Sequence, residues 1–436
     1  MISLAEKAQK VINNNWRDGF SIPTNKLYPF QWLWDSGFVA LGNGTQNIAK
    51  AIEEIDKMFS GQWANGMVPH ILFHSENEKT YFPNYDFWNS NINDGAPLYP
   101  KSSGITQPPV FGFVLKELLE IHKDSTELKE FAKHILPKIK AYHKFLYTYR
   151  DHKNEGLFHI YHPWESGRDN SPIWDKSMSR IKIDKNTIPE YTRRDTQLMD
   201  ASERPTTDKY DRYVYLLELG KKYKYDGKEI AEESPFLIQD CMMNAILIKS
   251  NTSLIEIGQE LDIDTQEIEE WQALSKANFN TKFWNEKLQT FVSYDCRSAE
   301  QIEYKEIGGF TAMFGECANQ EQAKAITEYL QDLHDRGYYL CPSFDVDSEL
   351  FDSKRYWRGP VWPQMNWIVA KGLKAYGYNE LAEIVKSDLL ELVGKLGFHE
   401  YFEPQKKMVE TISKGYGGDN FSWTASTVLN FLNTEL

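Results

Sequence analysis

The sequence contains no long hydrophobic run and no low-complexity spacer. Its longest apolar runs, such as the one around residues 366–371, fall well short of the roughly 18 residues that suggest a membrane helix. A chain of 436 residues could form two domains, but two domains would need a visible linker rich in proline, glycine or serine, and none is present. We therefore expect one domain over residues 1–436 and no membrane partner.

Cysteine is scarce. The four cysteines, Cys241, Cys296, Cys317 and Cys341, form no Cys-x-x-Cys pair and are too few for a disulfide scaffold in so long a chain. The first ten residues carry charges among their apolar positions and lack the unbroken hydrophobic core of a secretory signal. Both features predict a protein of the reducing cytoplasm.

Motifs that hold metals or cofactors are missing as well. The histidines form no His-Glu-x-x-His motif, and the chain has no Gly-Lys-Ser/Thr phosphate loop, no Gly-x-Gly-x-x-Gly after a strand and no Gly-x-Ser-x-Gly nucleophile elbow. The net charge of −14, from 63 acidic and 49 basic residues, would repel a polyanion. We expect no cofactor, no metal and no nucleic-acid partner.

Aromatic residues, by contrast, are plentiful. The chain has 13 Trp, 24 Tyr and 24 Phe, more than an ordinary core needs, and flat aromatic faces suit the C–H faces of sugar rings. This composition alone is a weak indication, because aromatic residues more often belong to the core.

Apolar residues spaced three and four apart dominate the chain and predict an all-α fold. The predicted helices cover residues 3–14, 36–58, 109–122, 127–148, 208–223, 235–249, 264–277, 320–333, 359–375, 378–395 and 421–434. Asp208 and the polar run 251–253 have the composition of helix starts. Three short stretches between helices, 156–161, 290–294 and 397–402, resemble one another. Helix pairs with a hairpin on one face predict an (α/α) barrel, and an irregular helical bundle is the alternative.

The densest group of polar and aromatic residues is the segment 161–175. Two prolines, a glycine and an Asp-Asn-Ser-Pro turn exclude a helix, yet its two tryptophans favour burial, which is typical of a structured pocket wall. A carboxylic acid buried beside tryptophan stays protonated near neutral pH and can donate a proton to a leaving oxygen. By spacing alone Asp169 and Glu165 are nearly equal candidates, and Glu165 could equally hold the loop by hydrogen bonds.

A second carboxylate must come from another segment, because acid and base flank the scissile bond of a glycoside. Glu400 and Glu403, in the stretch 398–404, are the candidates. In an extended segment they lie on opposite faces, so only one of them should face a pocket. The alternative is that either is a solvated charge at a strand edge.

Two further clusters run from an aromatic loop into a helix. In the first, residues 28–38, Gln31 and Asp35 could bind sugar hydroxyls while Trp32 or Trp34 packs on the ring, although Asp35 could equally be only a helix cap. In the second, residues 356–367, Arg358 could pair with a catalytic carboxylate. The polar loops 204–210 and 415–425 precede helices and could line the mouth of a pocket.

Taken together and in this order, these motifs resemble those of glycoside hydrolase family 63. The matching segments are residues 31–36, 65–69, 103–109, 162–172, 356–362 and 421–425, so the resemblance spans nearly the whole chain. The short length, with the motifs 204–206 and 210–213, is most similar to the bacterial mannosylglycerate and glucosylglycerate hydrolases of that family.

The resemblance implies an (α/α)6 barrel with short β-hairpin loops at one face, and hydrolysis of a small α-linked glycoside with inversion. Asp169 would be the general acid, and Glu400 would activate water as the general base. Arg204 and Tyr210 would meet the carboxylate of a glycerate aglycone, which suits the fork of an arginine. The remaining expected substrate contacts are Tyr28, Trp32, Trp34, Asp35, Gln107, Trp164, Gly167, Tyr356, Trp357, Arg358 and Trp362.

Two other functions remain open at this stage. One is an α-glucosidase or trehalase-like hydrolase of a neutral disaccharide, whose sugar-ring contacts would look the same. The other is a sugar epimerase or isomerase on the same barrel, for which His70, His162 and His399 would have to move protons. A homo-oligomer is also left open.

Overall fold

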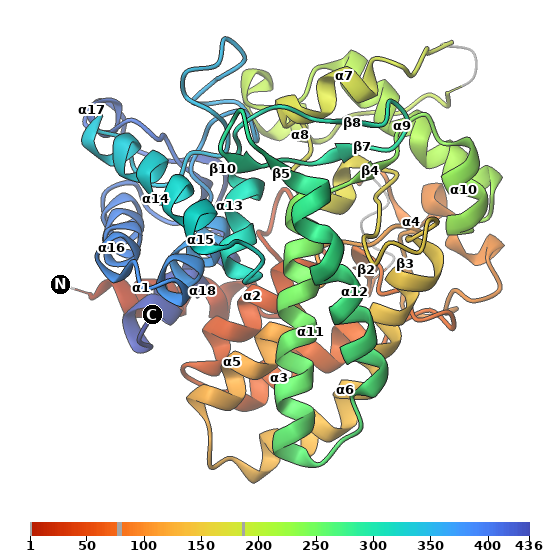
Figure 1. Ribbon diagram of the computed structural model, residues 1–436, viewed down its shortest axis with the longest axis horizontal. Helices are drawn as coiled ribbons and strands as arrows, with labels where there is room; N and C mark the ends of the chain where they lie inside the picture. The colour runs from red at the N-terminus through yellow and green to blue at the C-terminus, as the bar shows by residue number, and fades with distance from the viewer. Residues whose placement is uncertain (1, 76–80, 185–187) are drawn as a thin grey trace.

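Six largely buried helices form a closed ring within the part of the chain that the computed structural model describes, residues 2–75, 81–184 and 188–436 (Figure 1). They are α2 (Leu33–Gly44), α5 (Phe111–Ile121), α11 (Cys241–Leu261), α13 (Ile307–Phe314), α15 (Pro363–Ala375) and α18 (Ser422–Asn433). Each contacts the next in this order, and α18 contacts α2. Helices α2, α13 and α15 are buried on nearly every side, as expected inside such a ring.

A second set of helices alternates with the ring along the chain. It consists of α1 (Leu4–Asn15), α3 (Ile48–Phe59), α6 (Thr126–Tyr149), α12 (Gln266–Phe283), α14 (Gln320–Asp335) and α16 (Asn379–Leu396). These helices bury one stripe each: α3, for example, buries Ala51, Ile55 and Met58, spaced four and three apart. The contacts of α1 with α18, α3 with α2 and α16 with α15 place the second set outside the ring. The alternation gives an (α/α)6 barrel, as predicted.

Short antiparallel strands and helices decorate the loops. The strands are β1 (Gln31–Trp32), β2 (Ile71–Phe73), β3 (Lys101–Ser102), β4 (Ile238–Gln239), β5 (Trp284–Asn285), β6 (Thr290–Phe291), β7 (Tyr294–Asp295), β8 (Glu300–Gln301), β9 (His399–Tyr401) and β10 (Tyr416–Asp419). They pair in the orders β1-β2-β3, β4-β7-β8, β5-β6 and β9-β10. The loop helices are α4 (Tyr85–Trp88), α7 (Asp175–Met178), α8 (Asp195–Leu198), α9 (Thr207–Lys222), α10 (Gly227–Glu233) and α17 (Lys406–Val409).

Four details of the helix prediction are wrong. The helix predicted over 235–249 begins only at Cys241, because Ile238–Gln239 form strand β4 and Asp240 caps α11. The stretch 36–58 is two helices, because the chain turns after Gly44 and Asn47 caps a new helix through its side chain. The polar run 251–253 lies inside α11 rather than at a helix start. Helix α13 was not predicted, because it is short and apolar on every face and so has no periodicity. Among the described residues, no helix has the length and hydropathy needed to cross a bilayer.

Candidate active site

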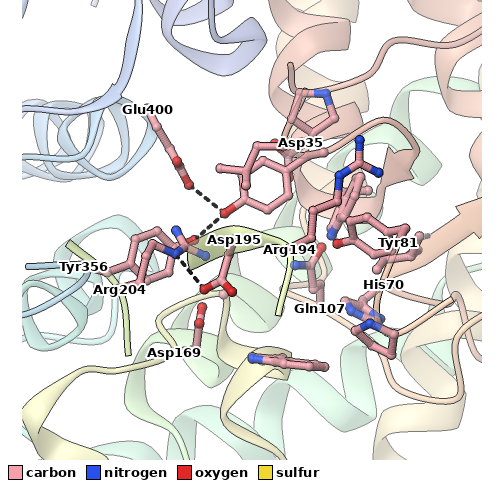
Figure 2. A pocket seen from close by; sticks show the side chains of 18 of the residues that line it. Asp35, His70, Tyr81, Gln107, Asp169, Arg194, Asp195, Arg204, Tyr356 and Glu400 are labelled. Carbon is pink, nitrogen blue, oxygen red and sulfur yellow. Dashed lines mark hydrogen bonds and ion pairs between the residues drawn. The ribbon is translucent and has the colours of Figure 1, made fainter. Parts of the chain in front are cut away.

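A cavity opens at the ends where several ring helices begin. Its wall includes Trp34 and Asp35 in the first turn of α2, Gln107 ahead of α5, and Trp423 in the first turn of α18. The expected site residues that line it are Tyr28, Trp32, Trp34, Asp35, Gln107, Trp164, Gly167, Asp169, Arg204, Tyr210, Tyr356 and Glu400. Residues that are far apart in the sequence therefore meet in one hollow (Figure 2).

Asp169 reaches the cavity from a loop that is fixed on both sides. Before it, Gly167 has a φ of +67°, and a Cβ there would lie 2.5 Å from the Trp34 ring, so only glycine fits. After it, the backbone N–H of Asn170 donates to the Tyr213 hydroxyl at 3.0 Å. Burial raises the pKa of Asp169 to about 7, with Arg204 lowering it and Glu400 raising it further. This carboxyl can therefore carry a proton near neutral pH.

Glu400 faces the cavity from β9. Its Oε1 accepts the Tyr28 hydroxyl at 3.2 Å, and its Oε2 accepts the backbone N–H of Gly418 at 2.9 Å. Burial raises the pKa of Glu400, while Arg204 and these hydrogen bonds lower it. Because the carboxylate keeps several donors, it is better stabilised in the ionised form than a bare buried acid.

Glu403 does not face this cavity. Its Oε2 accepts the hydroxyls of Ser353 at 2.8 Å and Tyr416 at 3.1 Å, and it is absent from the cavity wall. Alternation along the extended segment thus separates Glu400 from Glu403, as the pattern predicts.

Arg204 lies between Asp169 and Glu400 in the view of Figure 2. Its Nε donates to Asp195 Oδ2 at 3.2 Å, and its guanidinium carbon lies 4.2 Å over the Tyr356 ring. The buried NH1 group has no hydrogen-bond partner among the described residues. An arginine held on one side and unsatisfied on the other is suited to binding an anion in the cavity.

Asp195 is held in turn by Arg193. The Nε and NH2 groups of Arg193 donate to the two carboxylate oxygens of Asp195 at 3.0 and 2.6 Å. The same guanidinium lies 4.5 Å over the ring of Tyr210, which lines the cavity. This side of the cavity is therefore a connected network of charged and aromatic groups.

Asp35 is not a helix cap. The N-cap of α2 is Trp32, which makes no side-chain capping bond, whereas Asp35 lines the cavity with its buried Oδ1 unsatisfied among the described residues. Burial, with Glu400 adding to it, raises the pKa of Asp35 well above its usual range. Such an acid can exchange hydrogen bonds with hydroxyl groups of a ligand.

Gln31, its suggested partner, lies behind the wall. Its amide donates to Glu54 Oε1 at 3.1 Å and its oxygen meets His74 Nε2 at 2.7 Å, so it supports the site rather than lining it.

Glu165 holds the loop, which was the structural alternative for this residue. It is fully buried, pairs with Arg150 at 2.8 Å, and accepts the backbone N–H groups of Tyr161 at 2.9 Å and Thr106 at 3.3 Å. All of its acceptor capacity goes to the fold.

Trp357, Arg358 and Trp362 do not line the cavity. The two tryptophan rings stack at 3.8 Å, and Trp357 lies 6.2 Å from the ring of Trp34, so they form a layer behind the wall. Arg358 pairs with Asp175 at 3.0 Å and not with Asp169 or Glu400. The suggested pairing of Arg358 with a catalytic carboxylate is wrong, because Asp175 on α7 takes up its charge.

Several wall residues were not anticipated from the sequence, among them Tyr81, Arg194 and Asp195. His70 was considered only as a proton carrier for an epimerase, and Phe421 belongs to the loop 415–425 that was expected at the mouth of a pocket. The charged run 193–195 was the available signal for Arg194 and Asp195, but it stands in a segment without periodicity. Of the three histidines that an epimerase would need, only His70 lines the cavity. Nε2 of His162 meets the Tyr213 carbonyl at 3.1 Å, and its Nδ1 accepts the Trp164 N–H at 3.0 Å.

The part of the chain that the structure describes holds no cluster of three or more His, Cys, Asp or Glu side chains arranged to bind a metal ion.

The fold is an (α/α)6 barrel, and its cavity holds two carboxyl groups, Asp169 and Glu400. Both features are typical of glycoside hydrolases. A neutral trehalase from Saccharomyces cerevisiae has the same fold, with a TM-score of 0.57 at 16% identity, covering 95% of this chain and 73% of the other. Residues 28–424 match the model of the mannosylglycerate hydrolase MGH1-like glycoside hydrolase domain. The chain belongs to this family and is a glycoside hydrolase.

Relatives of known activity match over their whole length. A mannosylglycerate hydrolase of Thermus thermophilus is 39% identical over 97% of this chain and 99% of its own, and a glucosylglycerate hydrolase of Mycolicibacterium hassiacum is 30% identical over 98% and 97%. The crystal structure of the Thermus thermophilus enzyme of family 63 in complex with Tris and D-glycerate has a TM-score of 0.92 at 39% identity, covering 99% of this chain and 100% of the other.

Proposed function

We propose that this protein hydrolyses mannosylglycerate or glucosylglycerate to the free hexose and glycerate with inversion at the anomeric carbon. The observation that carries the proposal is the presence of two buried carboxyl groups, Asp169 and Glu400, in one cavity that also holds an incompletely paired arginine, Arg204. The relatives act on these two glycosides, which join a neutral sugar to an anionic aglycone.

Asp169 acts as the general acid. With its pKa raised to about 7, it keeps a proton near neutral pH and gives it to the glycosidic oxygen as the bond to the anomeric carbon breaks. The leaving group then departs as neutral hydroxyl rather than as an alkoxide, which lowers the barrier.

Glu400 acts as the general base. It removes a proton from a water molecule, whose oxygen attacks the anomeric carbon from the face opposite the leaving group. The hydroxyl of Tyr28, which donates to Glu400 Oε1, fixes the carboxylate, and Tyr356 touches that hydroxyl at 3.4 Å. Attack by water in this way forms no covalent intermediate, and it requires the two carboxyl groups to stand roughly 6.5–9.5 Å apart.

The rest of the wall divides between sugar and aglycone. Asp35, Gln107 and Trp34 lie at the barrel end of the cavity, where polar groups meet hydroxyls and a ring packs on the sugar. Arg204 receives the glycerate carboxylate, with Tyr210 beside it. Because wall residues come from Pro23 to Trp423, we take residues 1–436 as one catalytic domain.

A hydrolysis screen tests the proposal. Purified protein is incubated with mannosylglycerate, glucosylglycerate, trehalose and kojibiose, and proton NMR during the first turnovers records which anomer appears. We expect cleavage of a glycerate compound with first release of the β-anomer. Release of the α-anomer would exclude inversion, cleavage of neutral disaccharides alone would exclude the anionic aglycone, and a single isomerised sugar would identify an epimerase.

A further inference from the structure

One buried charge beside the site has no part in the mechanism. Arg168 stands between Gly167 and Asp169, which both line the cavity, yet Arg168 itself is absent from the wall and is 1% exposed. Its side chain therefore runs into the protein while that of Asp169 faces the ligand. A guanidinium in this position needs partners inside the fold.

The partners come from two neighbouring helices of the ring. The NH2 group of Arg168 binds Asp240 Oδ2 at 2.5 Å, and its NH1 group binds Glu306 Oε2. The two carboxylates are 0% and 2% exposed. One planar fork thus connects the loop of Asp169 to two acids at once, with a separate nitrogen for each, a geometry that the single ammonium nitrogen of a lysine does not reproduce.

Both acids are also helix caps. Asp240 Oδ1 accepts the backbone N–H of Met243 at 2.9 Å at the start of α11, and Glu306 Oε2 accepts that of Gly308 at 2.7 Å at the start of α13. A cap has a fixed place relative to its helix. The position of the Arg168 side chain is therefore fixed relative to the first turns of α11 and α13, which belong to the inner ring of the barrel.

Gly308 leaves room for this fork. A Cβ at this position would lie 2.3 Å from Arg168 NH1 and 2.5 Å from Glu306 Oε1. Glycine inside a helix is less favourable than alanine, so its presence in α13 needs a reason. The reason here is the space that the guanidinium occupies.

Stability alone does not account for these contacts. Buried ion pairs lose so much hydration that apolar residues of the same volume often stabilise a fold as well or better. Such a pair does hold its side chains in one defined geometry. The main chain of Arg168 is fixed as well, because its N–H donates to Ser166 Oγ at 3.0 Å and its carbonyl accepts a hydrogen bond from Trp174 Nε1 at 2.9 Å.

We propose that Arg168 is a positioning residue for Asp169: by gripping the caps of α11 and α13, it sets where the acid carboxyl stands relative to the glycosidic oxygen. This inference rests on the proposed function, in which Asp169 protonates the leaving group. Displacing a catalytic group by about 1 Å can cost on the order of 100-fold in rate.

Two variants weaken the contacts of Arg168 with Asp240 and Glu306 in different ways. Arg168→Lys keeps the charge but cannot bridge both acids in one plane. Gly308→Ala keeps every charged group and crowds both the guanidinium and the Glu306 carboxylate with a methyl group, while the alanine itself favours the helix. Each variant has a matched control. Arg180→Lys alters an arginine that pairs with one acid only, its NH2 group meeting the two oxygens of Asp295 at 2.9 and 2.7 Å. Gly394→Ala adds a methyl inside α16 where nothing lies within 4 Å.

The readout is the dependence on the leaving group. Each variant is assayed on the glycerate glycoside and on the α-glycosyl fluoride of the same sugar, whose fluoride departs with little help from an acid. We expect Arg168→Lys and Gly308→Ala to lose about 10- to 100-fold in kcat on the glycoside, with KM within about twofold, and less than about threefold on the fluoride. Both controls should keep the parent rates on both substrates.

Equal losses on the two substrates, or no loss on either, would overturn the proposal. Failure of both variants to fold, judged by circular dichroism and thermal unfolding, would overturn it as well, because the contacts would then be structural. Asp169→Asn, measured alongside, separates this inference from the proposed function. If Asp169→Asn spares the fluoride and Arg168→Lys does not, the positioning role alone fails, whereas if Asp169→Asn loses both activities equally, the acid assignment fails.

Discussion

Asp195 accepts a hydrogen bond from Arg204 Nε at 3.2 Å, while the NH1 group of the same cavity-lining arginine has no hydrogen-bond partner among the described residues. The same carboxylate binds Arg193 through both oxygens, so one acid orders two arginines. The pKa of Asp195 is lowered by these arginines although burial opposes them. Asp195 is therefore favoured in its charged form, which holds Arg204.

Replacing Arg204 should weaken binding of an anionic aglycone. We expect Arg204→Ala to raise KM for the glycerate substrate so that kcat/KM falls about 10- to 100-fold, the effect of losing about 1.5–3 kcal/mol from a charged hydrogen bond. Cleavage of any neutral disaccharide that the enzyme accepts should change little. Asp195→Asn should give a smaller loss of the same kind, and Asp200→Asn, which breaks a surface pair with Lys354, should give none. Equal losses on charged and neutral substrates would contradict an anion-binding role.

Mutation should show that Asp169 and Glu400, but not the neighbouring acid Glu403, are needed for activity. We expect Asp169→Asn and Glu400→Gln to fold normally and to lose at least about 100-fold in kcat, as expected for removal of a general acid or base. Glu403→Gln is the matched control for Glu400, since it stands three residues away and hydrogen-bonds Ser353 and Tyr416 outside the cavity. If Glu403→Gln proved the inactive variant, the assignment of the base would be wrong.

Local helical periodicity predicted an (α/α) barrel, whereas its sixfold form and a wall residue such as Gln107 came from the family resemblance, whose expected contacts cover about half of the cavity wall. Ring helices begin just after aromatic, polar loops, and alternation in the stretch 398–404 is enough to separate Glu400 from Glu403. Side-chain direction at a turn was less accessible. Trp357 lies in the left-handed region with a φ of 56°, and its ring stacks on Trp362 rather than lining the cavity as Tyr356 does.

Long-range charge pairing was also beyond the sequence. Arg358 could have met either acid of the site, and only the tertiary structure places Asp175 within 3.0 Å of it. Asp195 and Arg194 lie in a segment with neither helical nor strand periodicity, where nothing local distinguishes a cavity wall from a solvated loop.

The pH dependence of stability should reveal the raised pKa of Asp169. In the native state its pKa is about 7, whereas in the unfolded chain it lies near 3.8. Between these values the native state keeps a proton that the unfolded state releases, so this group's contribution to stability is complete below about pH 4 and is lost as pH rises through 7. We expect Asp169→Asn, which cannot ionise, to unfold at a higher temperature than the parent at pH 8, with the gap closing toward pH 4. A gap that is constant with pH would show that Asp169 is ionised throughout.

The activity should follow the same titration. Because only protonated Asp169 can donate to the leaving oxygen, kcat on the glycoside should fall as pH rises above about 7. On the α-glycosyl fluoride this alkaline limb should be weak or missing, since that leaving group needs little protonation. A limb of equal size on both substrates would assign it to a group other than the acid.

The pair between Glu165 and Arg150 should act on the fold, not on the chemistry. Glu165→Gln keeps the shape of the side chain but leaves the guanidinium of Arg150, 2% exposed, without its countercharge, which costs about 3–5 kcal/mol for a buried pair. We expect this loss in the free energy of unfolding from urea titrations, with kcat nearly unchanged at temperatures where the variant is folded. The control is Glu130→Gln on α6, whose pair with Lys133 is exposed and should contribute less than about 1 kcal/mol. A Glu165→Gln protein as stable as the parent but inactive would return Glu165 to the list of candidate acids.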